Sequence, residues 1–170
     1  MRTLSLITAL AALALAGPAL AQTVALKGPD GESASLSAAD LAALPQVKLT
    51  VTHHGKTSTF EGAPLADVVA RVGAASGKAV RGPELATVIR VTAKDGYQVV
   101  FGLAETDPGT RKGRIILADR GDGGPLKDDG PFRLVVEDDL RPARSARMVE
   151  TIEVIRLANA KPAEAGEHKH

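Results

Sequence analysis

The spacing of hydrophobic residues changes period several times along the chain, and each period predicts a different element. Strict alternation over residues 47–54 predicts a strand whose apolar face is formed by Val47, Leu49, Val51 and His53. The chain turns at Gly55-Lys56 and returns over residues 57–60, so we expect a hairpin here. His53 therefore closes the apolar face of this hairpin near its tip.

Two segments have the periodicity or the capping residues of helices. Pro64 opens a helix that Gly73 ends, and its apolar stripe consists of Leu65, Val68, Val69 and Val72. A shorter helix is predicted to begin after Ser37, because Ser37 and Asp40 have the spacing of a capping box, and to run to about Leu44 before Pro45 ends it. We expect the longer helix to pack on a sheet.

Most of the remaining chain predicts short strands separated by turns. These strands are expected over residues 23–27, 87–93, 97–101, 114–118, 132–136 and 148–157. Asp95-Gly96 indicates a type I′ turn between two of them. The last strand has apolar residues on both faces, Ile152 and Val154 on one and Ile155 and Leu157 on the other. We therefore expect both of its faces to be buried.

Strands outnumber helices and much of their pairing is local, which predicts an α+β domain with a mostly antiparallel or mixed sheet and a few short helices. Residues 22–158 form one domain in this prediction, without an internal linker. The chain has no Trp, three Phe and one Tyr, so the core must consist mainly of Val, Leu, Ile and Ala.

Both ends of the chain predict segments outside this domain. Residues 1–21 combine Arg2, an apolar stretch and Ala19-Leu20-Ala21, the pattern of a secretory signal cleaved before Gln22. A membrane anchor is the competing interpretation, but the apolar stretch is short and is interrupted by Gly17-Pro18. We therefore expect a periplasmic or secreted protein without a stable membrane anchor. Residues 159–170, which include a His-Lys-His ending, predict a disordered tail.

Charge and cysteine content exclude several kinds of function. Without Arg2 the chain has 20 basic residues against 20 acidic ones, and it lacks the basic excess and stacking aromatics of a nucleic-acid-binding protein. The sequence contains no Cys, so disulfides, thiolate metal sites and cysteine nucleophiles are excluded.

Three arginines at three-residue intervals, Arg141, Arg144 and Arg147, lie between the last two predicted strands. A guanidinium offers a planar fork of donors that fits an oxyanion, and flanking strands would hold the three heads toward one side. In the competing interpretation, they form surface ion pairs with neighbouring acidic residues, namely Glu137, Asp138, Asp139 and Glu150.

The segments RIILADRGDGGPLKDDGPFRLVV and ARSARMVETIEV resemble the C-terminal half of the molybdopterin-binding domain of sulfite-oxidase-type oxidoreductases. Upstream, EGAPLADVVARVGA and DGYQVVFGLAE are similar to the Gly-Val-Pro-Leu helix and the Asp-Gly-Tyr hairpin of that family. The resemblance covers residues 47–157 and implies a sulfite-oxidase-like fold. It also implies that Arg144, Ser145 and Arg147 contact the pterin and phosphate of a molybdopterin cofactor.

The chain departs from the family at the positions that support catalysis. The family holds molybdenum through a cysteine in a segment that matches Thr52-His53-His54-Gly55, and it has an active-site tyrosine where this chain has Asp119. His53 occupies the resembled metal position and is a candidate ligand for zinc or copper, although a structural role is the alternative. Alternation would place only His53, and not His54, on the inward face.

Together with the resemblance, these features predict an exported molybdopterin-binding-like domain that is part of a periplasmic oxidoreductase system and lacks sulfite-oxidase-type catalysis. No catalytic residue is assigned, and whether the protein is an enzyme stays open. The alternative is a non-catalytic binding or interaction module for a small anion or a partner protein. In either case a pterin or another small anionic ligand, and a redox partner protein, are the expected partners.

Overall fold

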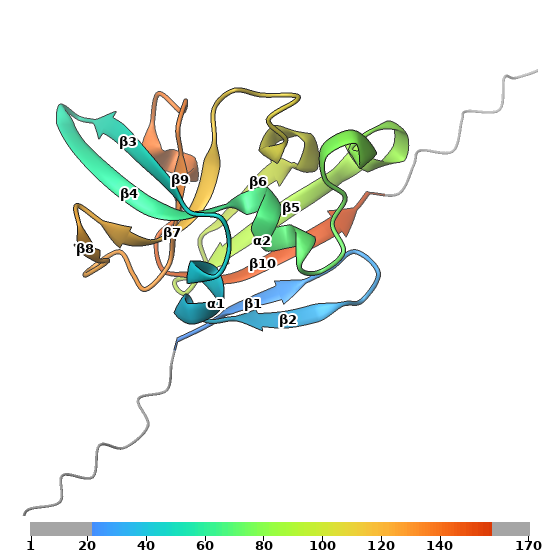
Figure 1. Cartoon of the computed structure of the whole chain (residues 1–170), viewed down its shortest axis with the longest axis horizontal. Helices are drawn as coiled ribbons and strands as arrows, with labels where there is room; N and C mark the ends of the chain where they lie inside the picture. Colours follow the sequence, from blue (N-terminus) through green and yellow to red (C-terminus); the bar gives the residue numbers. More distant parts are fainter. Residues whose placement is uncertain (1–21, 158–170) are drawn as a thin grey trace, which may run out of the picture.

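The computed structural model describes residues 22–157, which form two five-stranded sheets and two short α-helices (Figure 1). Sheet A has the order β2-β1-β10-β5-β6, and in sheet B the order β3-β4-β7-β8 is joined by β9, which also pairs with β7. The predicted signal (residues 1–21) and tail (residues 159–170) lie outside the described residues.

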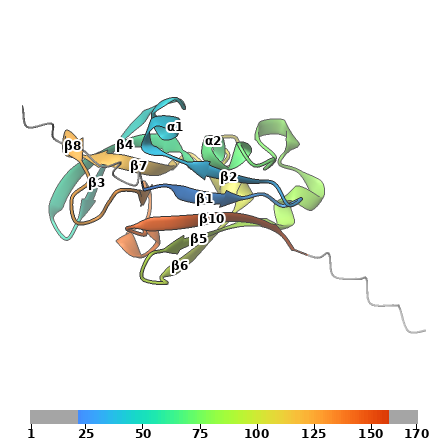
Figure 2. The same cartoon turned by 90° about the horizontal axis from the view of Figure 1, so that it is seen from below.

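Sheet A is antiparallel except at one position, where the first strand pairs with the last. Its strands are β1 (Val24–Lys27), β2 (Ser33–Leu36), β5 (Thr87–Ala93), β6 (Gln98–Gly102) and β10 (Val149–Arg156). β1 runs parallel to β10, and β10 runs antiparallel to β5 on its other side, so β10 is the central strand (Figure 2). The prediction of mixed, mostly antiparallel pairing is therefore confirmed.

Sheet B contains the predicted hairpin, which extends away from the body of the domain (Figure 1). Its strands are β3 (Val47–His53), β4 (Lys56–Pro64), β7 (Ile115–Gly121), β8 (Gly124–Pro125) and β9 (Arg133–Val136). β4 runs four residues past the predicted end at Phe60 because its second half pairs with β7. At the register shift in this pair, a Cβ on Gly62 would collide with the carbonyl oxygen of Leu117, so the two strands approach closely only with glycine there.

The two α-helices form where their sequence signals predicted them. In α1 (Ala38–Ala42), Ser37 and Asp40 make the reciprocal hydrogen bonds of a capping box. In α2 (Leu65–Ala70), the predicted apolar stripe is buried, and Gly73 ends the helical segment with a φ of 80°. Single turns of 3₁₀ helix make up the remaining helical segments, η1 (Gly77–Ala79), η2 (Gly82–Ala86), η3 (Leu103–Thr106) and η4 (Pro142–Arg144).

Two predictions about strands are wrong. Only one face of β10 is buried: Ile152 and Val154 are inside, whereas Ile155 is half-buried and Leu157 is 53% exposed. Within residues 22–157, no further layer covers the outer face of sheet A and buries these two side chains. The β5–β6 turn is not type I′, because only Gly96 has a positive φ (83°), whereas that turn requires positive φ at two central residues.

Aliphatic side chains dominate the core, as the low aromatic content requires. The main cluster lies between the sheets and includes α2, whereas a smaller cluster lies on the opposite face of sheet B. The smaller cluster consists of Leu49, Phe60, Ile116, Ala118 and Val135, with Val47, Val51 and Leu126 packed against it. Within residues 22–157, no helix is long and apolar enough to cross a membrane.

Candidate functional site

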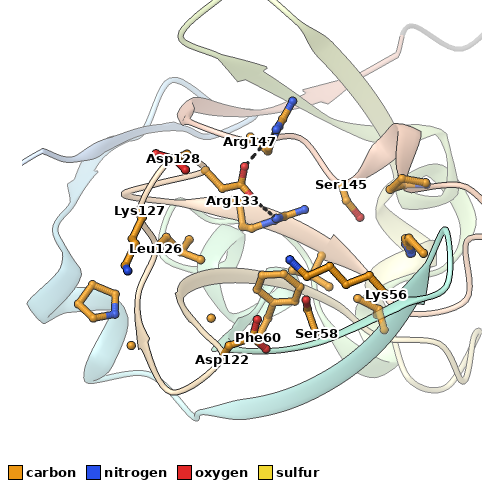
Figure 3. Close-up of a pocket in the computed structure, with 18 of the residues that line it drawn as sticks. Lys56, Ser58, Phe60, Asp122, Leu126, Lys127, Asp128, Arg133, Ser145 and Arg147 are labelled. Atoms are coloured by element: carbon orange, nitrogen blue, oxygen red, sulfur yellow. Dashed lines mark hydrogen bonds and ion pairs between the residues drawn. The ribbon is translucent and has the colours of Figure 1, made fainter.

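A cleft of 1080 Å³ opens over the smaller hydrophobic cluster, on the outer face of sheet B (Figure 3). One wall is the β3–β4 hairpin, and the other is the segment of residues 121–129 that leads from β7 through β8 toward β9. The segment between β9 and β10 closes one end with Pro142, Ser145 and Arg147. Segments that are distant in sequence therefore build this cleft together.

The floor of the cleft is apolar and is built around Phe60. Phe60 comes from β4 and Val135 from β9, the strands that pair with β7 on its two sides, and Leu126 packs against this cluster from the 121–129 segment. A Cβ on Gly121 would lie 3.0 Å from Leu126 Cδ2 and 3.1 Å from Phe60 Cε1. Glycine at this position therefore allows both side chains to pack closely under the cleft.

Arg133 is the most buried cation of the cleft, with a side chain that is 12% exposed. Side chains alternate between the two faces of β9, so Arg133 and Val135 share its outer face while Leu134 points to the other. The Arg133 Cζ lies 4.5 Å from the centroid of the Phe60 ring (Figure 3). Nη1 donates to Asp129 Oδ2, but the buried Nε has no hydrogen-bond partner within residues 22–157. Burial lowers the pKa of Arg133, the nearby Asp129 opposes this change, and Arg147 adds to it.

Asp129 links the two arginines of the cleft. Its Oδ2 accepts from Arg133, and its Oδ1 accepts from Arg147 Nη1 at 3.2 Å (Figure 3, dashed lines). The main-chain oxygen of Asp129 accepts from the backbone N–H of Met148 at 3.0 Å, which joins this wall of the cleft to the start of β10. One carboxylate thus bridges a buried guanidinium and one that is 66% exposed.

The charged side chains among the described residues that line the cleft give it a small net positive charge. Its cations are Lys56, Lys127, Arg133 and Arg147, and its carboxylates are Asp122, Asp128 and Asp129, which leaves one net positive charge if the histidines are neutral. Asp122 accepts from the backbone N–H of Thr59 at 2.8 Å, so this carboxylate has a structural role at the turn. The positive charge of Lys56 projects into the cleft from the hairpin (Figure 3).

The three guanidinium groups expected to reach one side diverge instead. Arg144 turns away from the cleft: Nη2 and Nε bind Asp139 at 2.7 and 2.9 Å, and Nη1 binds Glu105 at 3.0 Å. Asp139 above all, and also Glu105, raises the pKa of Arg144, and its Cζ lies 4.9 Å from the Phe101 ring centroid. Arg141 is exposed. The ion-pair interpretation therefore describes Arg144.

Of the predicted ligand-binding residues, Ser145 and Arg147 line the cleft and Arg144 does not. Ser145 is buried, and its Oγ accepts from the backbone N–H of Val136 at 3.2 Å, which fixes the end of the cleft. Arg133 instead presents a guanidinium to the cleft, which is the role that was expected for Arg144. Its signal in the sequence is an arginine that alternates with apolar residues in a short strand, on the same face as Val135.

His53 lies in the cleft, and its buried Nδ1 has no hydrogen-bond partner within residues 22–157. The expectation that only His53 faces inward is wrong: His54 also lines the cleft, because it leaves the strand conformation with a φ of 52° in the hairpin turn. Across the described part of the chain, no three His, Cys, Asp or Glu side chains are grouped so that they could hold a metal ion. His53 as a metal ligand stays a prediction.

These side chains fit one part of a molybdopterin cofactor and not the other. Arg133 and Arg147 present guanidinium groups to the cleft, as the phosphate of such a cofactor requires. The thiolate that would bind molybdenum has no counterpart, because the chain contains no Cys. The site therefore fits an organic anion and does not fit the metal centre.

Comparison with solved structures supports the α+β fold described above. No family model and no curated protein matches the sequence. Among solved structures, the sulfane dehydrogenase SoxCD from Paracoccus pantotrophus matches with a TM-score of 0.61 and 16% identity. The match covers 80% of this chain and 38% of the SoxCD chain, so the present chain corresponds to well under half of that protein. Over 80% of its length, the chain therefore shares the fold of part of the SoxCD chain, in agreement with the predicted α+β class.

Proposed function

We propose that this domain binds a small organic anion in the cleft over Phe60 and does not carry out sulfite-oxidase-type oxo transfer. A molybdopterin-type molecule that lacks a protein-bound metal is one candidate, and another organic phosphate or carboxylate is the alternative. The pattern of residues 1–21 supports export, so we place this activity in the periplasm or outside the cell. A redox protein that supplies or receives the ligand is the partner expected from the sequence resemblance.

The observation that carries this proposal is the burial of Arg133. Removing a guanidinium from water costs several kcal/mol unless its donors are satisfied, and here Nε has no partner within residues 22–157. An arginine kept in this state at the floor of an open cleft is typical of a binding site, because perturbed charged groups gather where ligands bind. Arg147 provides a second guanidinium on the same carboxylate.

The apolar floor supports an organic ligand more than a bare inorganic ion. Phe60, Leu126 and Val135 offer hydrophobic surface next to the two guanidinium groups. Binding sites for small molecules commonly combine an apolar lining with a few polar groups that fix the orientation of the ligand. The absence of Cys supports a role without a thiolate-bound metal.

Calorimetric titration of the purified protein with inorganic phosphate, pyrophosphate and a pterin phosphate tests this function. We expect Arg147→Gln to weaken binding about tenfold or more, since a charge-assisted hydrogen bond contributes about 1.5–3 kcal/mol. Arg120→Gln is the matched control, because Arg120 is half-exposed, pairs with Glu61 at 3.2 Å and does not line the cleft. The proposal is wrong if the parent binds none of these anions, or if the two variants bind equally well.

A further inference from the structure

We infer that Asp129 is a resident carboxylate that occupies the anion position of the cleft, and that a ligand binds by displacing it from Arg133 and Arg147. This inference rests on the proposed function and specifies how the same site selects its ligand. It makes Asp129 a residue that determines specificity, because a ligand must replace its two bonds.

The contacts of Asp129 are those of a bound ligand. Each carboxylate oxygen accepts from a different arginine, Oδ2 from Arg133 and Oδ1 from Arg147. A carboxylate or a phosphate ester offers two oxygens at the same spacing, so either can take over both bonds. A spherical anion such as chloride is a single atom and cannot offer a separate acceptor to each guanidinium group.

The structure allows this exchange without movement of the main chain. The backbone of Asp129 is held by the bond from the Met148 N–H, so rotation of the side chain is sufficient to vacate the position. The Asp129 side chain is 29% exposed and can turn toward water, where its charge is solvated. Arg133 is held on Phe60, and it therefore keeps its position for the incoming anion.

The surroundings of the position define the chemical class of the ligand. Arg133 covers the Phe60 ring, and Leu126 and Val135 continue the apolar surface beside it. We therefore assign the site to an organic carboxylate or phosphate ester with a compact apolar or aromatic body next to its acidic group. The acid replaces Asp129 while the body covers the floor.

Titrations of the parent, Asp129→Asn and Asp128→Asn with inorganic phosphate and with phenyl phosphate test the displacement. The two variants make the same change in charge at adjacent residues that both line the cleft, but the described contacts place only Asp129 between the arginines. We expect Asp129→Asn to bind both probes about tenfold or more tightly than the parent, because a charge-assisted competitor is removed. Asp128→Asn should gain less than about fivefold, the effect of a solvated charge.

An equal gain in both variants would mean that only the net charge matters and would overturn the inference. Weaker binding by Asp129→Asn would overturn it as well, because Asp129 would then position Arg133 for the ligand. If neither the parent nor any variant binds a probe, the proposed function itself fails. If the parent binds a probe and Asp129→Asn binds it with the same affinity, the inference is wrong while the proposed function stands.

A measurement on the parent protein avoids any dependence on how the variants fold. On addition of phosphate, the carboxyl carbon resonance of Asp129 should shift in the NMR spectrum while the Met148 amide stays protected from hydrogen exchange. An unchanged Asp129 resonance at saturating phosphate, or loss of Met148 protection, would contradict a displacement confined to the side chain.

Discussion

Replacing Arg133 by Met should leave the stability of the domain nearly unchanged while it removes anion binding. Met keeps an unbranched side chain on the Phe60 ring but has no charge and no N–H donor. The substitution therefore separates the effect of the buried guanidinium on stability from its effect on anion binding. If Arg133 instead stabilised the fold, its replacement would lower the free energy of unfolding.

The contacts of Arg133 allow a rough estimate of the change in free energy of unfolding. Loss of the bond to Asp129 costs about 1.5–3 kcal/mol, and loss of the contact with Phe60 at 4.5 Å costs about 0.5–2 kcal/mol. Removal of the buried, unpartnered Nε returns about 1–3 kcal/mol, and the rest of the guanidinium no longer has to be desolvated. The two sides nearly cancel, so we expect a net change within about 1 kcal/mol, or a melting temperature within about 2–4 °C of the parent.

Urea unfolding and phosphate titration of the same samples would measure both quantities. Arg120→Met is the control, since it removes an exposed guanidinium of sheet B whose partner Glu61 also binds Lys48. We expect this control to change neither stability nor binding appreciably. A loss of more than about 3 kcal/mol in Arg133→Met would show that Arg133 supports the fold, and parental binding by this variant would refute its role in the cleft.

Three further experiments test the fold. Gly62→Ala should lower the free energy of unfolding by about 3 kcal/mol or more in urea, because its Cβ meets the backbone of β7, and a loss below about 1 kcal/mol would contradict this. Arg114 lowers the pKa of Glu137, and their ion pair stabilises the fold by under about 1 kcal/mol. This stabilisation is present above about pH 4.3 and is lost as the pH falls through the lowered pKa of Glu137. Glu137→Gln should therefore reduce the loss of stability on acidification, measured by thermal melting from pH 6 to pH 2.5, and an unchanged slope would count against the pair. Val154→Asp should unfold the domain and Ile155→Asp should not, as circular dichroism would report; equal effects would contradict the assignment of faces.

The elements that the sequence predicted best are those whose signals are local. The capping box of Ser37 and Asp40 and the apolar stripe of α2 depend on residues within one or two turns of helix. The β3–β4 hairpin follows from the alternation in its own strands and from the turn between them. The exposed outer face of β10 could not be predicted in this way, because nothing in that strand encodes whether another layer covers sheet A.

The cleft depends on contacts between distant segments, which the sequence pattern does not contain. Arg133 reaches Phe60, which lies 73 residues earlier in the chain, and neither residue specifies the other. Arg144 is drawn away from the cleft partly by Glu105, 39 residues earlier. Regular spacing of arginines therefore indicated a segment that borders the cleft, but it could not distinguish Arg147, which lines the cleft, from Arg141 and Arg144, which do not.

The central place of β10 has a consequence for how the domain is made. β10 follows all the other strands in the chain, yet it joins the β1–β2 pair to the β5–β6 pair. As the ribosome synthesises the chain from its N-terminus, the two halves of sheet A have no common partner until β10 emerges. Such nascent chains expose apolar strand faces and unpaired edges for most of their synthesis, so sheet A must assemble after translation of the domain is complete. A chaperone that holds extended, apolar segments would therefore have its longest opportunity to bind before β10 has been made.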